Sequence, residues 1–170
     1  LDNLQSRVHP KGKPDWLAQD AEFILGDVAS KADMSRALEG VSHVVHLAAY
    51  QDYMPDFSTF FHVNTESSAL LFELILEKKL PVNKIVFASS QAVCGEGRYL
   101  CRTHGDVVPG PRPIQQLEQG DWDTRCPKCG DPMEPQLIGE ATVSPSTAYG
   151  ISKYAIELLA SRLGQRYGIP

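Results

Sequence analysis

The sequence contains no hydrophobic run that approaches the roughly 20 residues of a membrane-spanning helix. It also has no basic start followed by an apolar core, which would mark an export signal. Positive charge is not in excess, since the formal net charge is −5, and this offers no attraction to nucleic acids or anionic lipid surfaces. Nothing indicates an oxidising compartment, so disulfides are not favoured. We therefore expect a cytoplasmic protein whose partners include neither nucleic acid nor membrane.

The composition is ordinary for a globular protein, with 42% hydrophobic and 22% charged residues. Its 170 residues are enough for one domain with a hydrophobic core. The chain does not begin with Met, and it stops at Gly168-Ile169-Pro170 directly after a predicted helix, where another strand would be expected. We therefore expect an internal piece of a longer protein.

Short apolar segments alternate along the chain with longer amphipathic ones. In 60–79, for example, Leu70, Leu71, Leu74 and Ile75 repeat with the helical period. Strands are expected at 22–25, 44–47 and 84–88, the last two buried, and helices at 31–39, 60–79 and 146–167. The alternation predicts an α/β fold made of βαβ units, with a parallel sheet and helices on both of its faces.

The segment 96–145 interrupts this alternation, because it has no periodic pattern and collects prolines, glycines and three of the four cysteines. Cys101-x2-His104 and Cys126-x2-Cys129 form two ligand pairs separated by twenty-one residues, a pattern typical of a tetrahedral zinc site. With four protein ligands the ion would be structural, and it would order a segment with little apolar surface. A Cys126–Cys129 redox pair, or reduced cysteines without a role, are the open alternatives.

Tyr149 and Lys153 lie four residues apart in the predicted helix 146–167, so both side chains are on one face of it. A nearby ammonium favours the phenolate form and makes a phenol usable as a proton donor and acceptor near neutral pH. The Tyr-x3-Lys pattern alone is weak, because both residues are common. Its context strengthens it, since Ser89-Ser90 closes an apolar strand earlier in the chain.

Six motifs appear together in the order and spacing of a known family: Asp2-Asn3-Leu4, Gly26-Asp27-Val28, His46-Leu47-Ala48-Ala49, Asn64, Ser89-Ser90-x2-Val93-Cys94-Gly95 and Tyr149-x3-Lys153. On these residues the chain resembles the extended short-chain dehydrogenases/reductases and, more narrowly, the NAD-dependent nucleotide-sugar epimerase/dehydratase family. The Cys-rich insert resembles a zinc-ribbon-like module of a subset of bacterial members, among them deoxythymidine-diphosphate-rhamnose 4-epimerases.

The resemblance implies a Rossmann-type doubly wound parallel sheet that binds NAD at the carboxyl ends of its strands. Compared with the family, the chain lacks the first βα unit, which carries the glycine-rich pyrophosphate loop, and the substrate domain. It would consist of a partial NAD-binding domain (1–95), the Cys/His insert as a zinc module (96–145) and the catalytic helix of the Rossmann domain (146–170). By itself this piece would bind NAD poorly and be inactive.

The resemblance also implies cofactor contacts. Asp2 would accept hydrogen bonds from the adenosine ribose hydroxyls and repel a 2′-phosphate, which favours NAD over NADP; a simple turn aspartate is the alternative. Asp27 and Val28 would contact the adenine, and Asn64 would support the geometry of the active site. The other implied cofactor residues are Asn3, Leu47, Ala48, Ala49, Ser89, Tyr149 and Lys153.

Catalysis, on the same resemblance, would depend on Ser90, Tyr149 and Lys153. Tyr149 would take the proton from a sugar hydroxyl while hydride leaves the same carbon for the nicotinamide. Lys153 would hold the nicotinamide ribose, and Ser90 would hydrogen-bond the reacting oxygen. Gln91-Ala92 stand where sugar 4,6-dehydratases have an Asp-Glu pair, which argues against dehydration.

The implied function is NAD-dependent epimerisation of a nucleotide sugar through a transient keto intermediate, in the full-length protein. A sugar-nucleotide dehydrogenase or reductase, and a non-catalytic relative that senses NAD, are the alternatives. The resemblance further implies a homodimer formed through the helices that contain Asn64 and Tyr149. Four residues after the Ala-Ala turn either line the sugar pocket or serve packing: Tyr50, Tyr53, Met54 and Phe57.

Overall fold

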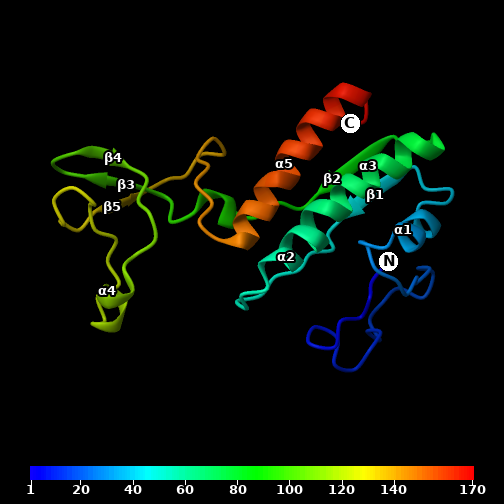
Figure 1. Ribbon diagram of the computed structural model, residues 1–170, viewed down its shortest axis with the longest axis horizontal. Coiled ribbons are helices and arrows are strands. Elements are labelled where there is room, and N and C mark those ends of the chain that lie inside the picture. The colour runs from blue at the N-terminus through cyan, green and yellow to red at the C-terminus, as the bar shows by residue number, and fades with distance from the viewer. The chain divides into compact units, whose positions relative to one another are not determined.

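The computed structural model describes all residues from Leu1 to Pro170, and they form two compact units (Figure 1). The first unit comprises Leu1–Ala88 and Ala155–Pro170, and the second comprises Ser89–Tyr154. The long helix α5 (Ala148–Tyr167) contributes its first residues to the second unit and the remainder to the first. No helix combines the length and the apolar character that crossing a membrane requires.

The first unit contains two parallel strands, β1 (His43–His46) and β2 (Lys84–Phe87), which pair in register from His43 with Lys84 to His46 with Phe87. A separate parallel bridge joins Asp2 to Leu25. The helical elements of this unit are α1 (Lys31–Ala37), α2 (Phe57–Phe60), the π-helical η1 (Phe61–Glu66) and α3 (Ser67–Lys78). The last three follow one another without a break and connect β1 to β2. This strand–helix–strand connection confirms the predicted α/β class with parallel pairing.

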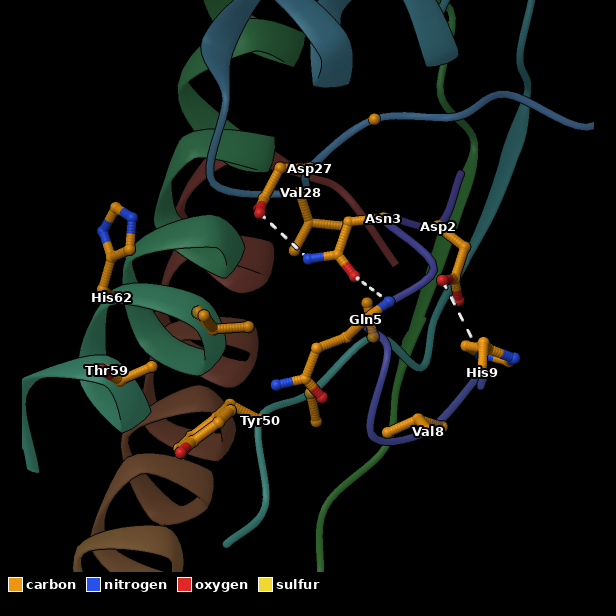
Figure 2. Close-up of a pocket in the computed structure, with 14 residues that line it drawn as sticks. Asp2, Asn3, Gln5, Val8, His9, Asp27, Val28, Tyr50, Thr59 and His62 are labelled. Atoms are coloured by element: carbon orange, nitrogen blue, oxygen red, sulfur yellow. Dashed lines mark hydrogen bonds and ion pairs between the residues drawn. The ribbon is translucent and has the colours of Figure 1, made fainter. Parts of the chain in front are cut away.

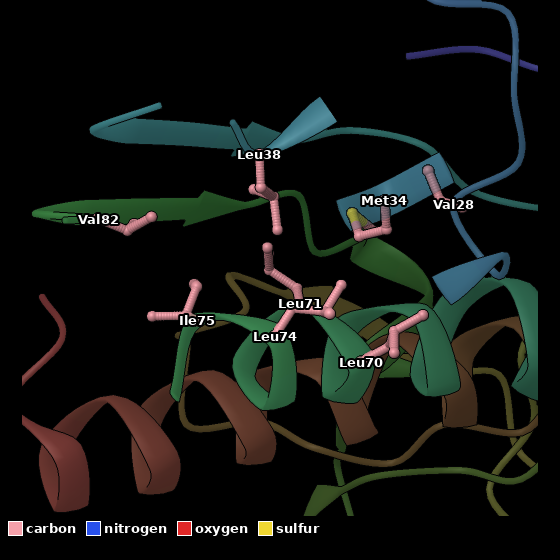
Figure 3. Packing of buried hydrophobic residues seen from close by; sticks show 8 residues of the cluster. All are labelled: Val28, Met34, Leu38, Leu70, Leu71, Leu74, Ile75 and Val82. Carbon is pink, nitrogen blue, oxygen red and sulfur yellow. The ribbon is translucent and has the colours of Figure 1, made fainter. Parts of the chain in front are cut away.

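The core of the first unit is formed largely by the apolar face of α3 (Figure 3). Leu71 and Leu74 are completely buried there, as the helical period of their segment predicts. Burial of one such side chain contributes about 1.5–3 kcal/mol. The buried residues of this cluster are Val28, Met34, Leu38, Leu70, Leu71, Leu74, Ile75 and Val82.

The strands of the first unit are less buried than their apolar sequences predict. Val44 and Ile85 pack against the core, whereas Val45 is 63% exposed and Val86 is 47% exposed. Successive side chains of a strand point to opposite faces, and residues of this chain cover only one face of the pair. The expectation of two fully buried strands is therefore wrong. The strand expected at 22–25 is likewise reduced to the bridge at Leu25.

The second unit begins with a short 3₁₀ helix, η2 (Gln91–Cys94), and continues into an antiparallel sheet with the strand order β4-β3-β5. The strands are β3 (Arg98–Cys101), β4 (Gly105–Val107) and β5 (Glu134–Gln136), and the short helix α4 (Ile114–Glu118) lies between the last two in sequence. The buried apolar cluster here consists of only Cys101, Cys126 and Met133. So small a cluster contributes little stability, and the sheet therefore needs a second source of stability.

Candidate functional site

Asp2 lies in the N-terminal bridge, where its backbone hydrogen-bonds with Ile24 and Gly26. Its carboxylate oxygen Oδ1 accepts a hydrogen bond of 2.7 Å from the Leu4 amide, and Leu4 adopts a left-handed backbone with a φ of 50°. This is an Asx-type turn, so the simple turn role considered for Asp2 is present. The same turn fixes the carboxylate at the end of a strand, where a ribose-binding acid is found in sheets of this kind.

Asp27 is held beside Asn3, whose amide Nδ2 donates to Asp27 Oδ2 over 3.1 Å. The other oxygen, Asp27 Oδ1, accepts from the Ala29 amide at 2.8 Å, and the neighbouring Val28 is buried. These contacts join two of the predicted cofactor segments, 2–4 and 26–28, at one corner of the first unit.

Both segments line a cavity of about 370 Å³ in the first unit (Figure 2), a volume within the ordinary range for small-molecule sites. The predicted cofactor residues that line it are Asp2, Asn3, Asp27, Val28, Ala48 and Ala49. Leu47 does not line this cavity, and its side chain is exposed. Gly26, from the same motif as Asp27, and Tyr50, one of the four residues considered for the sugar pocket or for packing, also line it. The lining is completed by residues that the sequence did not identify: Gln5, Val8, His9, Thr59, His62 and Val63.

Asn64 lies in the π-helical η1, and its side chain is completely buried. Its Oδ1 accepts from the Tyr50 amide at 2.7 Å, and its Nδ2 donates to the Tyr50 carbonyl at 3.0 Å. π-Helical turns are rare in proteins and are frequent at functional sites. Asn64 therefore fixes the backbone of Tyr50, which follows Ala48-Ala49 at the edge of the cavity.

Tyr50 is the aromatic residue of the cavity wall. Its hydroxyl donates to Asp56 Oδ2 over 2.5 Å, and this hydrogen bond, together with burial, raises the pKa of Tyr50. The raised pKa keeps Tyr50 protonated, so its hydroxyl serves as a hydrogen-bond donor to Asp56. The other three residues considered for the sugar pocket or for packing have exposed side chains in this chain: Tyr53, Met54 and Phe57.

In the second unit, the turn that contains Ser90 packs against the start of α5. Ser90 Oγ accepts from the Ala92 amide at 3.2 Å and so caps η2. A Cβ atom at Gly150 would lie only 2.5 Å from the Ala92 carbonyl oxygen, so this contact requires glycine. Because Gly150 directly follows Tyr149, two of the three predicted catalytic residues are on segments in direct contact.

Lys153 lies one helical turn after Tyr149 in α5, and its Nζ is 6.0 Å from the centroid of the Tyr149 ring. The Lys153 side chain is buried, with 3% of the residue exposed, and burial lowers the pKa of its ammonium group. Lysine is seldom buried so completely. The structure therefore places the predicted phenol–ammonium pair on one helix face.

We expect Gly150→Ala to destabilise the protein, although alanine normally favours a helix over glycine by about 1 kcal/mol. The added methyl group would overlap the Ala92 carbonyl, and overpacking of this kind costs about 1–3 kcal/mol. Urea unfolding measures the change in the free energy of unfolding. Gly139→Ala is the matched control, because a Cβ there meets no atom within 4 Å. An unchanged unfolding midpoint for Gly150→Ala would show that η2 and α5 do not pack closely.

The four residues predicted to bind a metal converge in the second unit, where the ligand atoms of Cys101, His104, Cys126 and Cys129 lie within 4.8 Å of one another. Cys101 Sγ is 3.7 Å from Cys129 Sγ and 3.6 Å from His104 Nδ1. Cys126 Sγ is 3.5 Å from the same nitrogen. Tetrahedral zinc, with Zn–S of about 2.3 Å and Zn–N of about 2.0–2.1 Å, implies ligand separations of about 3.5–3.8 Å. The donor set and its spacing therefore fit a closed zinc site.

The thiols of this cluster influence one another's ionisation. Burial opposes ionisation of Cys126, but hydrogen bonds from the backbone amides of Lys128 and Cys129 outweigh it and lower the pKa of Cys126 to about 6. At Cys129 a backbone hydrogen bond from Asp131 favours ionisation, yet burial and the neighbouring thiols raise its pKa to about 12. Of these two thiols, Cys126 is therefore the one that ionises first. The amides of Lys128 and Cys129 point at its sulfur and form a tight turn, the knuckle, over 126–130.

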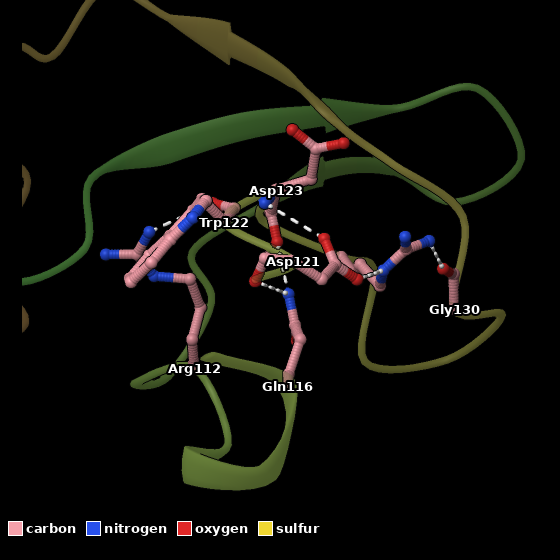
Figure 4. Close-up of polar contacts among 7 residues, drawn as sticks. Arg112, Gln116, Asp121, Trp122, Asp123 and Gly130 are labelled. Atoms are coloured by element: carbon pink, nitrogen blue, oxygen red, sulfur yellow. Dashed lines mark hydrogen bonds and ion pairs between the residues drawn. The ribbon is translucent and has the colours of Figure 1, made fainter. Parts of the chain in front are cut away.

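A polar network holds the 126–130 loop in place (Figure 4). Arg125 Nε donates to Asp121 Oδ2 at 2.6 Å, and Arg125 Nη1 donates to the Gly130 carbonyl at 3.2 Å. The hydrogen bond between the two side chains raises the pKa of Arg125 and lowers that of Asp121. Gln116 Nε2, from α4, donates to the Asp121 carbonyl at 3.2 Å. The network thus connects α4 to the loop that carries two of the four candidate ligands.

Comparison with known proteins decides the family. The profile of the 3-beta hydroxysteroid dehydrogenase/isomerase family matches residues 7–107, which is more than half of the chain. The chain belongs to this family. It is an extended short-chain dehydrogenase/reductase of the NAD-dependent epimerase/dehydratase type, which confirms the prediction from the six motifs.

This family member is similar to a dTDP-L-rhamnose 4-epimerase of Burkholderia thailandensis, with 29% identity over 92% of this chain and 44% of that protein. It is 31% identical to the decarboxylating sterol-4-alpha-carboxylate 3-dehydrogenase of Bos taurus over 55% of this chain and 26% of that protein. The solved UDP-glucuronic acid 4-epimerase of Bacillus cereus, in complex with NAD, superposes with a TM-score of 0.60 and 20% identity, over 98% of this chain and 39% of that one. The structural likeness confirms the Rossmann-type fold. The chain spans less than half the length of each of these proteins.

Two features of the site in this family member were missed by sequence reasoning. Gly150 offered a signal, because a glycine inside a helix is unfavourable and indicates close approach of another backbone. The cavity-lining residues Val8 and His9 offered none, because they lie in an aperiodic loop and reach the cavity only through the fold of that loop.

Proposed function

We propose that the full-length protein epimerises a nucleotide sugar through a transient keto intermediate, with NAD as its cofactor. The observation that carries this proposal is the packing of the Ser90 turn onto the Tyr149 turn, with the buried Lys153 on the same helix face. The similarity to the Burkholderia thailandensis epimerase supports the nucleotide-sugar class. It covers 92% of this chain and therefore most of the Cys-containing insert, whereas the match to the bovine sterol dehydrogenase covers 55%.

The cavity of the first unit suits the adenosine part of NAD. Asp2 would accept hydrogen bonds from the ribose hydroxyls, and its negative charge would repel a 2′-phosphate. Asp27 would accept from the adenine amino group, and Val28 would form an apolar wall. When bound, NAD would take up a hydride from the sugar carbon and return it, so that no net oxidation occurs.

The chemistry of the chain itself would be proton transfer and orientation. Tyr149 would take the proton of the sugar hydroxyl as the carbonyl forms and would give it back when the intermediate is reduced on its other face. Lys153 would place positive charge beside the phenol, and Ser90 Oγ would donate a hydrogen bond to the reacting oxygen. Gln91 and Ala92 supply no acid or base for elimination of water, which supports epimerisation over dehydration.

The second candidate is a dehydrogenase that oxidises a hydroxyl with net production of NADH. The family profile and the bovine relative, both named for dehydrogenases, favour it. The same three side chains would serve this reaction, because its proton transfer is the first half of the epimerase cycle. The two candidates differ only in whether the keto product leaves the site.

Incubation of the full-length protein with sugar nucleotides and a catalytic amount of NAD separates these functions. We expect interconversion of C4 epimers of a dTDP- or UDP-linked sugar, followed by NMR, without accumulation of NADH absorbance. Stoichiometric NADH would favour the dehydrogenase. Binding of NAD without any turnover across the panel would favour the non-catalytic alternative.

We also propose that Cys101, His104, Cys126 and Cys129 bind one structural Zn²⁺ ion. Two soft thiolate ligands on the knuckle, with a third thiolate and an imidazole from the β3–β4 hairpin, form a donor set that zinc prefers. All four positions would be filled by protein, which leaves no open site for chemistry. The ion would instead supply the stability that the small apolar cluster of this unit lacks.

A further inference from the structure

The loop after Asp2 returns to the site where it began. Asn3 Oδ1 accepts from the Gln5 amide at 3.1 Å, and the Gln5 carbonyl accepts from the amides of Val8 at 2.9 Å and His9 at 2.8 Å. With the left-handed Leu4, these bonds close a tight turn over 2–9. The turn brings the His9 side chain back beside Asp2, although the two residues are seven positions apart.

His9 faces the carboxylate that the ribose would contact. His9 Nε2 lies 3.8 Å from Asp2 Oδ1, within the range of an ion pair, and the His9 side chain is 23% exposed (Figure 2). Oδ1 also accepts from the Leu4 amide, whereas Asp2 Oδ2 makes no hydrogen bond within the chain. One carboxylate oxygen is therefore held by the loop, and the other is left for a ligand.

Three basic side chains around this corner have other partners. Arg7 pairs with Asp52, and Lys13 lies over the Phe23 ring, 5.2 Å from its centroid. His62, the other basic residue that lines the cavity, is 2.7 Å from Glu66. No arginine lines the cavity, so nothing there is suited to bind a 2′-phosphate in the way that NADP sites do.

We propose that His9 is a positioning residue that orients Asp2 toward the ribose diol, so that the pair, rather than Asp2 alone, sets the preference for a 2′-hydroxyl over a 2′-phosphate. The inference rests on the NAD site of the proposed function. The His9 imidazole restrains rotation of the carboxylate and keeps Oδ2 toward the cavity.

The proposal is tested by calorimetric titration of the full-length protein with NAD⁺ and with NADP⁺, which gives a dissociation constant for each cofactor. His9→Ala should weaken NAD⁺ binding about five-fold, because the Asp2 carboxylate loses the polar contact that restrains it, while His9→Gln, which keeps a polar nitrogen near the same place, should stay within two-fold. His9→Arg should lower the ratio of the NADP⁺ dissociation constant to the NAD⁺ dissociation constant at least ten-fold, because it places a permanent cation beside Asp2. Lys11→Ala is the control, since Lys11 is an exposed cation of the same loop outside the cavity lining.

If His9→Ala and His9→Arg leave both constants within two-fold, or if Lys11→Ala changes them equally, the role of His9 is refuted while the proposed epimerase is unaffected. A protein that shows the expected shifts but no turnover on any sugar nucleotide would support the role of His9 and refute the proposed activity. Wild-type protein that binds neither cofactor would refute both. Unfolding midpoints of the variants show that loss of binding is not loss of fold.

Discussion

Tyr149→Phe should lower the turnover number of the full-length protein by about 10²–10⁴-fold, the usual contribution of a positioned proton donor and acceptor. The substitution removes one oxygen and keeps the ring that packs near Lys153 Nζ. The affinity for NAD and the free energy of unfolding should therefore change little. Single-turnover kinetics with a sugar nucleotide, together with NAD titration, separates the loss of chemistry from a loss of binding.

Tyr154→Phe is the matched control for this variant. Tyr154 lies in the same helix, five residues after Tyr149 and so on a different face, and loss of its hydroxyl should leave turnover within two-fold. Equal activity of wild type and Tyr149→Phe would remove the central residue of the proposed mechanism. A large loss in both variants would indicate that the helix, rather than one hydroxyl, had been disturbed.

Cys126→Ser should abolish stoichiometric zinc binding and unfold the Cys-containing segment. Structural zinc in small modules is bound with an apparent free energy of about 10–16 kcal/mol. The apolar cluster that would remain consists of Cys101 and Met133, with partly buried Tyr99 and Val107, and cannot replace such a contribution. We expect about one zinc per chain in the wild type by elemental analysis. In the variant we expect rapid proteolysis within 96–145.

Cys94→Ser is the control, because Cys94 is the one cysteine outside the cluster and lies in η2. It should retain zinc and protease resistance. Wild-type protein without zinc, or Cys126→Ser with an undiminished zinc content, would refute the metal site. In the first case, a 3.7 Å approach of Cys101 Sγ to Cys129 Sγ would call for another explanation, such as thiol hydrogen bonding.

The sequence predicted the chemical groups of the site better than their surroundings. The spacing Cys101-x2-His104 and Cys126-x2-Cys129 identified four residues that do converge, because a tight turn lets two ligands with two residues between them face one point. Tyr149 and Lys153 share a helix face for a local reason, the 3.6-residue period. Predicting this therefore required no knowledge of the rest of the fold. In each case the geometry was set by residues close together in the chain.

The prediction was weaker wherever the answer depended on what covers a surface. The strand segments 44–47 and 84–88 are apolar apart from His46 and Lys84, and they were expected to be buried on both faces. Val45 and Val86 are nevertheless exposed, because residues of this chain cover only one face. Periodicity reports which side chains share a face, but not whether another element packs on that face. The exposure of Leu47 has the same cause.

By itself, the sequence determined the family, the α/β class and the identity of the catalytic and metal-binding candidates, because these depend on motifs and on local periodicity. Only the tertiary structure decided that Gly150 lets the Ser90 turn meet the Tyr149 helix, that Asn64 fixes the Tyr50 backbone, and that His9 returns to Asp2. These contacts join residues that are far apart in sequence or lie in aperiodic loops. Their closeness results from packing and hydrogen bonding of the folded chain, which no local pattern records.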